Sequence, residues 1–145
     1  MVTELRYLGA TLLSGRAFRV SMARARRSFS KAANCILSRL QGSASEEVIF
    51  HLIRTKALPS LLYATEAIRL QRSEIASLDF IVVRFAMKIL KTSNNDIVLN
   101  CLSQFGFELP SNVLNVRRSK FESKFKNTTN TVCLIAAALR GHSMN

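Results

Sequence analysis

The sequence has 145 residues, of which 48% are hydrophobic, so it is long and apolar enough to bury the core of one domain and is not a disordered basic arm. Its 21 lysines and arginines exceed its 9 acidic residues and give a net charge of +12, which predicts an anionic partner: nucleic acid, an anionic membrane surface or an acidic protein. No apolar run approaches the roughly 18 residues of a membrane span, so we expect no transmembrane helix.

The first predicted element is a short strand. Side chains from Leu5 to Leu12 alternate with period two, and the pattern stops near Ser14. We assign residues 1–15 to this strand segment. Because a single strand is not stable alone, we expect its pairing partner to be missing from this chain or to come from another one.

A basic helix is predicted over residues 17–40. Its apolar residues recur every three or four positions and define one stripe: Phe18, Met22, Ala25, Phe29, Ala32, Ile36 and Leu40. At about 100° per residue, the opposite side carries a set of cations: Arg16, Arg19, Arg24, Arg27 and Lys31, with Arg26 and Arg39 on the flanks. No acidic residue lies between Glu4 and Glu46, so we predict that one face packs and the other binds phosphates, with Gly42 ending the helix.

Two helices are predicted next. Ser43 or Ser45 caps the first, which ends at residues 56–59. Its packing side is made of Val48, Ile49, Leu52 and Ile53. Pro59 suits the first turn of the second helix, over residues 60–70, because proline lacks the N–H group that would be unpaired there.

A long helix from Ser73 to about Lys91 is predicted to lie at the centre of a bundle. Its main apolar stripe is made of Ile75, Leu78, Val82, Phe85 and Ile89. Phe80 and Met87 give it a second apolar side. A helix with two apolar sides is typically covered on both, which favours the central position.

Two shorter patterns follow the long helix. One predicts a helix that starts at Ser93 or Asn94, runs to Phe105 and stops at Gly106. The other predicts a last basic helix over residues 110–126.

The expected fold class is mainly α. We expect a helical bundle over residues 16–92 with additional helices over 93–126, preceded by the strand segment. Residues 127–145 are expected to form a loosely ordered tail with a short helix over 132–139.

The residues that could carry chemistry form no recognisable catalytic or metal-binding pattern. Cys35, Cys101 and Cys133 are odd in number and contain no CxxC pair, which argues against disulfides and zinc sites and favours a reducing intracellular location, nuclear or cytoplasmic. Asp79 and Asp96 are not clustered as a divalent ion requires, and the two histidines have no partner at motif spacing. We therefore predict no catalytic residue, no metal site and no cofactor in this chain.

Three short motifs stand in order along the sequence. Tyr-Leu-Gly occupies residues 7–9, Leu-Pro-Ser-Leu-Leu-Tyr occupies 58–63 with Glu66 three residues later, and Arg-Arg-Ser-Lys-Phe occupies 117–121. With the basic helix between the first two, this order over about residues 5–126 resembles the C-terminal region of non-LTR (LINE-type) retrotransposon reverse transcriptases.

The resemblance implies that residues 4–13 correspond to a primer-grip strand and residues 16–91 to a thumb, which holds template and primer by backbone contacts. It also implies that Tyr7 contacts the primer, while an ordinary packing role for Tyr7 stays open. Together with the charge pattern, the predicted nucleic-acid-binding residues are Tyr7, Arg16, Arg19, Arg24, Arg27, Lys31, Arg117, Arg118 and Lys120.

The sequence also departs from that family. It has no Tyr/Phe-Ala-Asp-Asp motif and no upstream palm aspartate, Ala64 stands where the family commonly has Gly, and no zinc knuckle follows. We therefore expect a fragment of an RNA-directed DNA polymerase that is inactive alone, with divalent metal needed only in a complete polymerase. Its expected partners are an RNA or DNA template–primer and the missing palm region.

Other interpretations stay open. The basic residues of the first helix and of residues 117–120 could simply be solvated surfaces. The chain could be a non-enzymatic basic helical module that binds an acidic protein or an anionic membrane. It could also be a mitochondrial helical protein whose first roughly 27 residues form a transit peptide, because that segment is rich in Arg and Ser and poor in acids.

Overall fold

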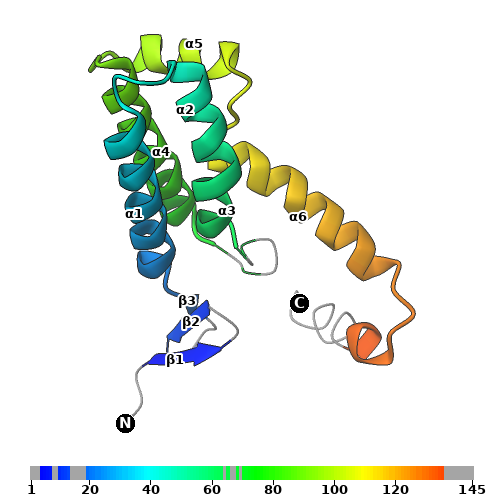
Figure 1. Ribbon diagram of the computed structural model, residues 1–145. Helices are drawn as coiled ribbons and strands as arrows, with labels where there is room; N and C mark the ends of the chain where they lie inside the picture. Colours follow the sequence, from blue (N-terminus) through cyan, green and yellow to red (C-terminus); the bar gives the residue numbers. More distant parts are fainter. Residues whose placement is uncertain are drawn as a thin grey trace.

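The computed structural model of this protein describes residues 4–7, 10–13, 19–63, 65, 68 and 70–135. The chain is mainly α-helical with short strands at its N-terminal end, which confirms the expected fold class (Figure 1). In chain order the elements are β1 (Glu4–Tyr7), β2 (Ala10–Leu13), β3 (Arg19–Val20), α1 (Ala23–Leu40), α2 (Glu46–Leu52), the π-helical turn η1 (Ile53–Ala57), α3 (Leu58–Leu61), α4 (Arg72–Leu90), α5 (Asn95–Gln104) and α6 (Pro110–Lys126).

The N-terminal segment is an antiparallel sheet rather than one strand. β1 pairs with β2 in the register Glu4↔Leu13 to Tyr7↔Ala10, and β2 pairs with β3 through Leu12. The prediction of a missing or external partner was therefore wrong. The two residues between the paired strands are Leu-Gly rather than the Asn-Gly or Asp-Gly that marks a hairpin, so the sequence lacks the usual hairpin signal.

Helix α1 starts at Ala23 and not at residue 17 as predicted. The residues just before Ala23 pair with β2 instead of joining the helix: Val20 pairs with Leu12, and the Ser21 N–H donates to the Thr11 carbonyl oxygen at 2.8 Å. Phe18 lies outside the described residues. The buried residues of α1 and its N-cap are Met22, Phe29, Ala33 and Leu37. The buried stripe is therefore rotated around the helix relative to the predicted one. The other predicted members, Ala25, Ala32, Ile36 and Leu40, are only half-buried.

The predicted break at residues 56–59 does not occur, because α2 continues through η1 into α3. The Ser45 hydroxyl accepts the Val48 N–H at 3.5 Å, which confirms Ser45 as the N-cap. Pro59 is tolerated in a continuous helix because the preceding turn is a π turn, in which the Leu58 N–H donates to the Ile53 carbonyl oxygen five residues back.

The rest of this region also differs from its prediction. The helix expected over 60–70 was wrong, since α3 ends at Leu61. Phe50 is buried, whereas Val48, predicted to pack, is 47% exposed. Both residues lie in α2, before the π turn, and the packing face there is made of Ile49, Phe50 and Ile53.

Helix α4 lies at the centre of the bundle, as predicted. It contacts α1, α2, α5 and α6, and it buries Leu78, Val82, Phe85 and Ile89. It begins at Arg72 after the N-cap Gln71, whose N–H donates to the Glu74 Oε2 at 2.8 Å, so Ser73 is not the cap. Phe80 was predicted to pack and instead is 63% exposed.

The last two helices match their predicted bounds closely. Asn94 caps α5 by accepting N–H groups of Asp96 and Ile97 at 2.9 and 3.3 Å. Helix α6 runs over the predicted residues 110–126 and leaves the bundle, burying only Pro110 and Leu114 (Figure 1).

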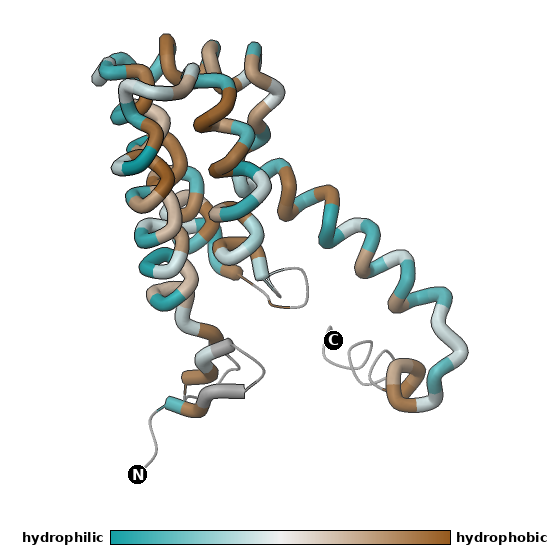
Figure 2. Tube along the Cα trace, in the orientation of Figure 1, coloured by the Kyte–Doolittle hydropathy of each residue, from teal (hydrophilic) through white to brown (hydrophobic). Residues whose placement is uncertain are grey.

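Beyond α6, the short helix predicted over 132–139 is described in part. Residues 131–135 are helical, and residues 136–145 lie outside the described part of the chain. Figure 2 shows hydrophobic residues concentrated in the bundle helices, whereas α6 is largely hydrophilic.

The core depends on the contact between α1 and α4. The rings of Phe29 and Phe85 meet edge to face, with centroids 5.4 Å apart and planes at 86°. Such pairs add stability beyond the burial of apolar area.

We expect Phe29→Ala to lower the free energy of unfolding by about 3–5 kcal/mol, because it leaves a cavity at the fully buried centre of this contact. The exposed Phe80→Ala variant on the facing helix should change it by less than about 0.5 kcal/mol. Urea unfolding followed by far-UV circular dichroism measures both. Equal losses in the two variants would contradict this core.

Candidate nucleic-acid interface

The predicted cationic face exists on α1 in a shortened form. Arg24, Arg27 and Lys31 are exposed and spaced by three and four residues. Arg27 and Lys31 each lie two positions from buried Phe29, about 200° around the helix, so they point away from the core. We call these three residues the α1 cationic face.

No carboxylate of the described residues forms an ion pair with this face. Among the described residues, the only ion pair joins the Arg118 Nε to the Glu122 Oε1 at 3.4 Å, within α6. The charge of Arg24, Arg27 and Lys31 is therefore left for solvent ions or an external anion.

The other predicted residues of the N-terminal set do not belong to this face. Arg19 lies in β3 and Tyr7 in β1, so the prediction that placed Arg19 on the helix was wrong. Arg16 lies outside the described residues, and the structure describes no side chain for Tyr7 or Arg19.

Arg26, predicted on the flank of the helix, turns toward α4. It is half-buried, and its Nη1 donates to the Ser77 Oγ at 3.1 Å. The rotation of the α1 stripe explains this, since Arg26 falls between the buried positions Met22 and Phe29.

The second predicted cluster lies on α6. Arg117 and Lys120 are exposed, and Arg118 is half-exposed and paired with Glu122. All three follow Leu114, the last buried residue of α6, on the part that projects from the bundle (Figure 1). The predicted binding residues that lie on helices therefore form two clusters, one on α1 and one on α6.

Sequence reasoning missed a third group of cations, between α1 and α4. Arg26, Arg84 and Lys88 line a groove of about 520 Å³ together with Ser30, Asn34, Ser77, Phe80, Ile81 and Phe85. The signal was present as Phe80, Arg84 and Lys88 at intervals of four on one ridge of α4, but Phe80 was assigned to the core. We call this the α1/α4 groove.

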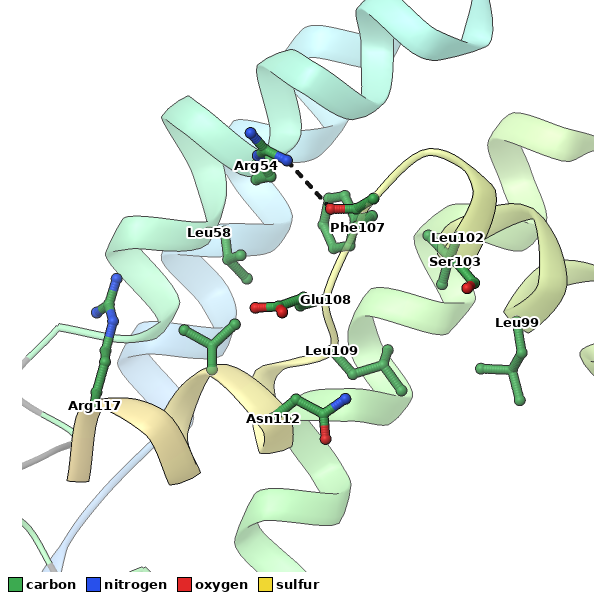
Figure 3. A pocket seen from close by; sticks show the side chains of 12 residues that line it. Arg54, Leu58, Leu99, Leu102, Ser103, Phe107, Glu108, Leu109, Asn112 and Arg117 are labelled. Atoms are coloured by element: carbon green, nitrogen blue, oxygen red, sulfur yellow. Dashed lines mark hydrogen bonds between the residues drawn. The ribbon is translucent and has the colours of Figure 1, made fainter. Parts of the chain in front are cut away.

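A larger cavity of about 720 Å³ lies between η1, α5 and α6 (Figure 3). Its wall is mixed: apolar Leu58, Leu99, Leu102, Leu109 and Val113 lie beside polar Ser103 and Asn112. The Arg54 Nη1 donates to the Gly106 carbonyl oxygen at 3.2 Å, and Arg117 lies at the rim. Because Glu108 also lines this cavity, it is less suited to a polyanion than the α1/α4 groove.

The described part of the chain contains neither a metal-binding cluster nor a membrane-spanning helix. No group of three or more His, Cys, Asp or Glu side chains is placed to hold a metal ion there. No helix in that part is both long and apolar enough to cross a bilayer. Cys35, Cys101 and Cys133 are free thiols.

Comparison of the chain with models of protein families, with curated proteins and with solved structures returned no match.

We expect the melting temperature to rise by a few degrees as sodium chloride increases. Raising ionic strength from about 0.01 M to about 0.1 M shortens the screening length from about 30 Å to about 10 Å, which weakens repulsion among unpaired cations. Thermal unfolding by circular dichroism measures this. A melting temperature that falls with added salt would show that attractive ion pairs outweigh the repulsion.

Proposed function

We propose that this chain is the primer-grip and thumb region of a non-LTR retrotransposon reverse transcriptase and that it binds the phosphate backbone of a template–primer duplex. The observation that carries the proposal is the exposed α1 cationic face, which forms no ion pair with the described part of the chain. The ordered motifs at residues 7–9, 58–63 and 117–121 support the same family.

The mechanism of binding is electrostatic. Arg24 and Lys31 are seven residues apart, so the face spans about 10 Å along α1, a length over which duplex DNA carries roughly six phosphates. Cations held on a packed helix displace condensed counterions when they approach that backbone. Such contacts position a duplex without reading its sequence.

Catalysis would come from outside these residues. The sequence has no Tyr/Phe-Ala-Asp-Asp motif, so the aspartates and divalent ions of a complete polymerase belong to a palm region that this chain does not contain. Helices α1 and α4 hold the cations, and the small sheet of β1, β2 and β3 directly precedes α1. In this proposal the sheet is the side that meets the palm.

One observation favours a second candidate, an anionic membrane surface. Val132, Leu134 and Ile135 are 74, 52 and 56% exposed, shortly after the basic end of α6 at Lys124 and Lys126. Exposed apolar side chains next to cations are typical of segments that lie in a bilayer interface. Vesicle binding therefore belongs in the test.

The mitochondrial alternative has a structural consequence. Removal of roughly the first 27 residues as a transit peptide would take away β1, β2, β3 and the first turn of α1. It would also remove Val20 and Met22, which are 5 and 6% exposed. Sequencing the N-terminus of the mature protein decides this alternative.

We expect the affinity for a primer–template duplex to fall steeply with salt. With four to six phosphates contacted, the slope of log K against log salt concentration should be about −4 to −5. Fluorescence anisotropy with a labelled duplex measures it. A salt-independent binding constant, or no binding at low salt by a folded sample, would remove the proposal. Stronger binding to anionic vesicles than to duplex would favour the membrane candidate instead.

We expect the triple variant Arg24→Gln, Lys31→Gln and Arg27→Gln to weaken duplex binding and to make the salt slope shallower by about 2.7, because each phosphate contact contributes about 0.9. The matched control removes the same charge from exposed sites on other elements: Lys56, Arg72 and Lys91. If both variants lose affinity equally, net charge and not the α1 cationic face is responsible.

A further inference from the structure

The α1/α4 groove combines an exposed aromatic ring with three cations. Phe80 is 63% exposed, and the guanidinium carbon of Arg84, one turn later on α4, lies 5.7 Å from its ring centroid. The Lys88 Nζ lies 5.2 Å from the centroid of Phe85, whose side chain is 7% exposed. Arg26 completes the set from the α1 side.

Each of these cations is oriented by a neutral partner. Arg26 donates to the Ser77 hydroxyl at 3.1 Å, and that hydroxyl itself donates to the Glu74 carbonyl oxygen at 2.7 Å. Arg84 and Lys88 rest on aromatic rings. Neutral partners fix the direction of a cation without cancelling its charge, so the groove presents positive charge that is already positioned.

The carboxylates of the two groove helices are engaged elsewhere. Helix α1 has none, and α4 has only Glu74 and Asp79. Glu74 accepts the backbone N–H of Gln71, and the Asp79 Oδ1 accepts the backbone N–H of Ser111 in α6 at 2.9 Å. Among the residues that the structure describes, no acidic side chain lines the groove. The site is therefore complementary to an anion along its length.

We propose that the α1/α4 groove binds single-stranded nucleic acid, with one unpaired base stacked on Phe80 and the adjoining phosphates held by Arg26, Arg84 and Lys88. The ridge from Phe80 to Lys88 is about 12 Å long, which suits a short stretch of strand. An aromatic ring beside a track of cations is the usual means of binding an unpaired strand without reading its sequence.

The chemistry of the two groove walls favours this ligand over an acidic peptide helix. A helix bound in a groove needs several apolar contacts at helical spacing. Here the α1 wall is polar, with Ser30 and Asn34, and Phe80 is the exposed ring on the α4 wall. A duplex has no free base face to offer Phe80, because its bases are already stacked on one another. The inference rests on the proposed function only in taking nucleic acid as the polyanion.

The test compares two labelled probes by fluorescence anisotropy: an oligothymidylate of about 15 nucleotides and a duplex of the same length. We expect Phe80→Leu, which keeps apolar volume but removes the ring, to weaken oligothymidylate binding by about 5-fold to 150-fold, the effect of losing one stacked base. Duplex affinity should stay within about twofold. Tyr63→Leu is the matched control, because Tyr63 is 61% exposed and lies outside the groove.

A second pair of variants tests the phosphates. Arg84→Gln with Lys88→Gln should make the salt slope for oligothymidylate shallower by about 1.4, at about 0.7 per contact on a single strand. Arg72→Gln, on the same helix but outside the groove, should leave the slope unchanged. Circular dichroism confirms that each variant is folded.

The outcomes separate this inference from the proposed function. If Phe80→Leu weakens both probes equally, or neither, the inference is wrong while duplex binding by wild type still supports the thumb assignment. If the folded wild type binds oligothymidylate but not duplex, the inference stands and the duplex-binding function falls. Displacement of oligothymidylate by polyglutamate at equal charge concentration would assign the groove to an acidic protein and overturn the inference.

Discussion

The contact between Phe29 and Phe85 determines what the rest of the surface presents. It fixes the rotation of α1 and α4 about their axes, because each ring is at most 7% exposed and meets the other edge to face. With Phe29 turned inward, Arg27 must face outward, and Arg26 is carried to the edge of α4. One apolar pair thus sets both the α1 cationic face and one wall of the α1/α4 groove.

The two proposed binding surfaces share α1, and this has a consequence for the ligand. Arg27 on the outer face and Arg26 in the groove are consecutive residues, about 100° apart around the helix. A duplex on the face and an unpaired strand in the groove would therefore meet along one helix. A junction between double and single strands, such as a primer end with its template overhang, has that shape.

Sequence patterns located those elements whose ends are marked by local chemistry. Pro110 begins α6 and Asn94 caps α5 as predicted. Proline has no N–H to leave unpaired in the first turn, and the asparagine side chain accepts the first N–H groups of its own helix. The predictions were wrong where contacts between residues far apart in the sequence determine the bounds of an element or the exposure of a side chain. Pairing of Val20 with Leu12 shortens α1, and the π turn before Pro59 joins α2 to α3. The exposure of Phe80 depends on how α4 packs, which periodicity alone does not specify.

Several of the nine carboxylates serve helix N-termini, which leaves the cations of α1 and α4 to serve binding. Glu46 and Asp96 lie in the first turns of α2 and α5, Glu74 accepts an N–H at the start of α4, and Asp79 accepts an N–H in the first turn of α6. At a helix N-terminus a carboxylate stabilises unpaired N–H groups and the positive end of the helix dipole. Carboxylates committed to these positions do not compete with phosphate for arginine. An incoming polyanion therefore meets cations that are already oriented, and its binding also relieves the repulsion that a net charge of +12 imposes on the folded chain.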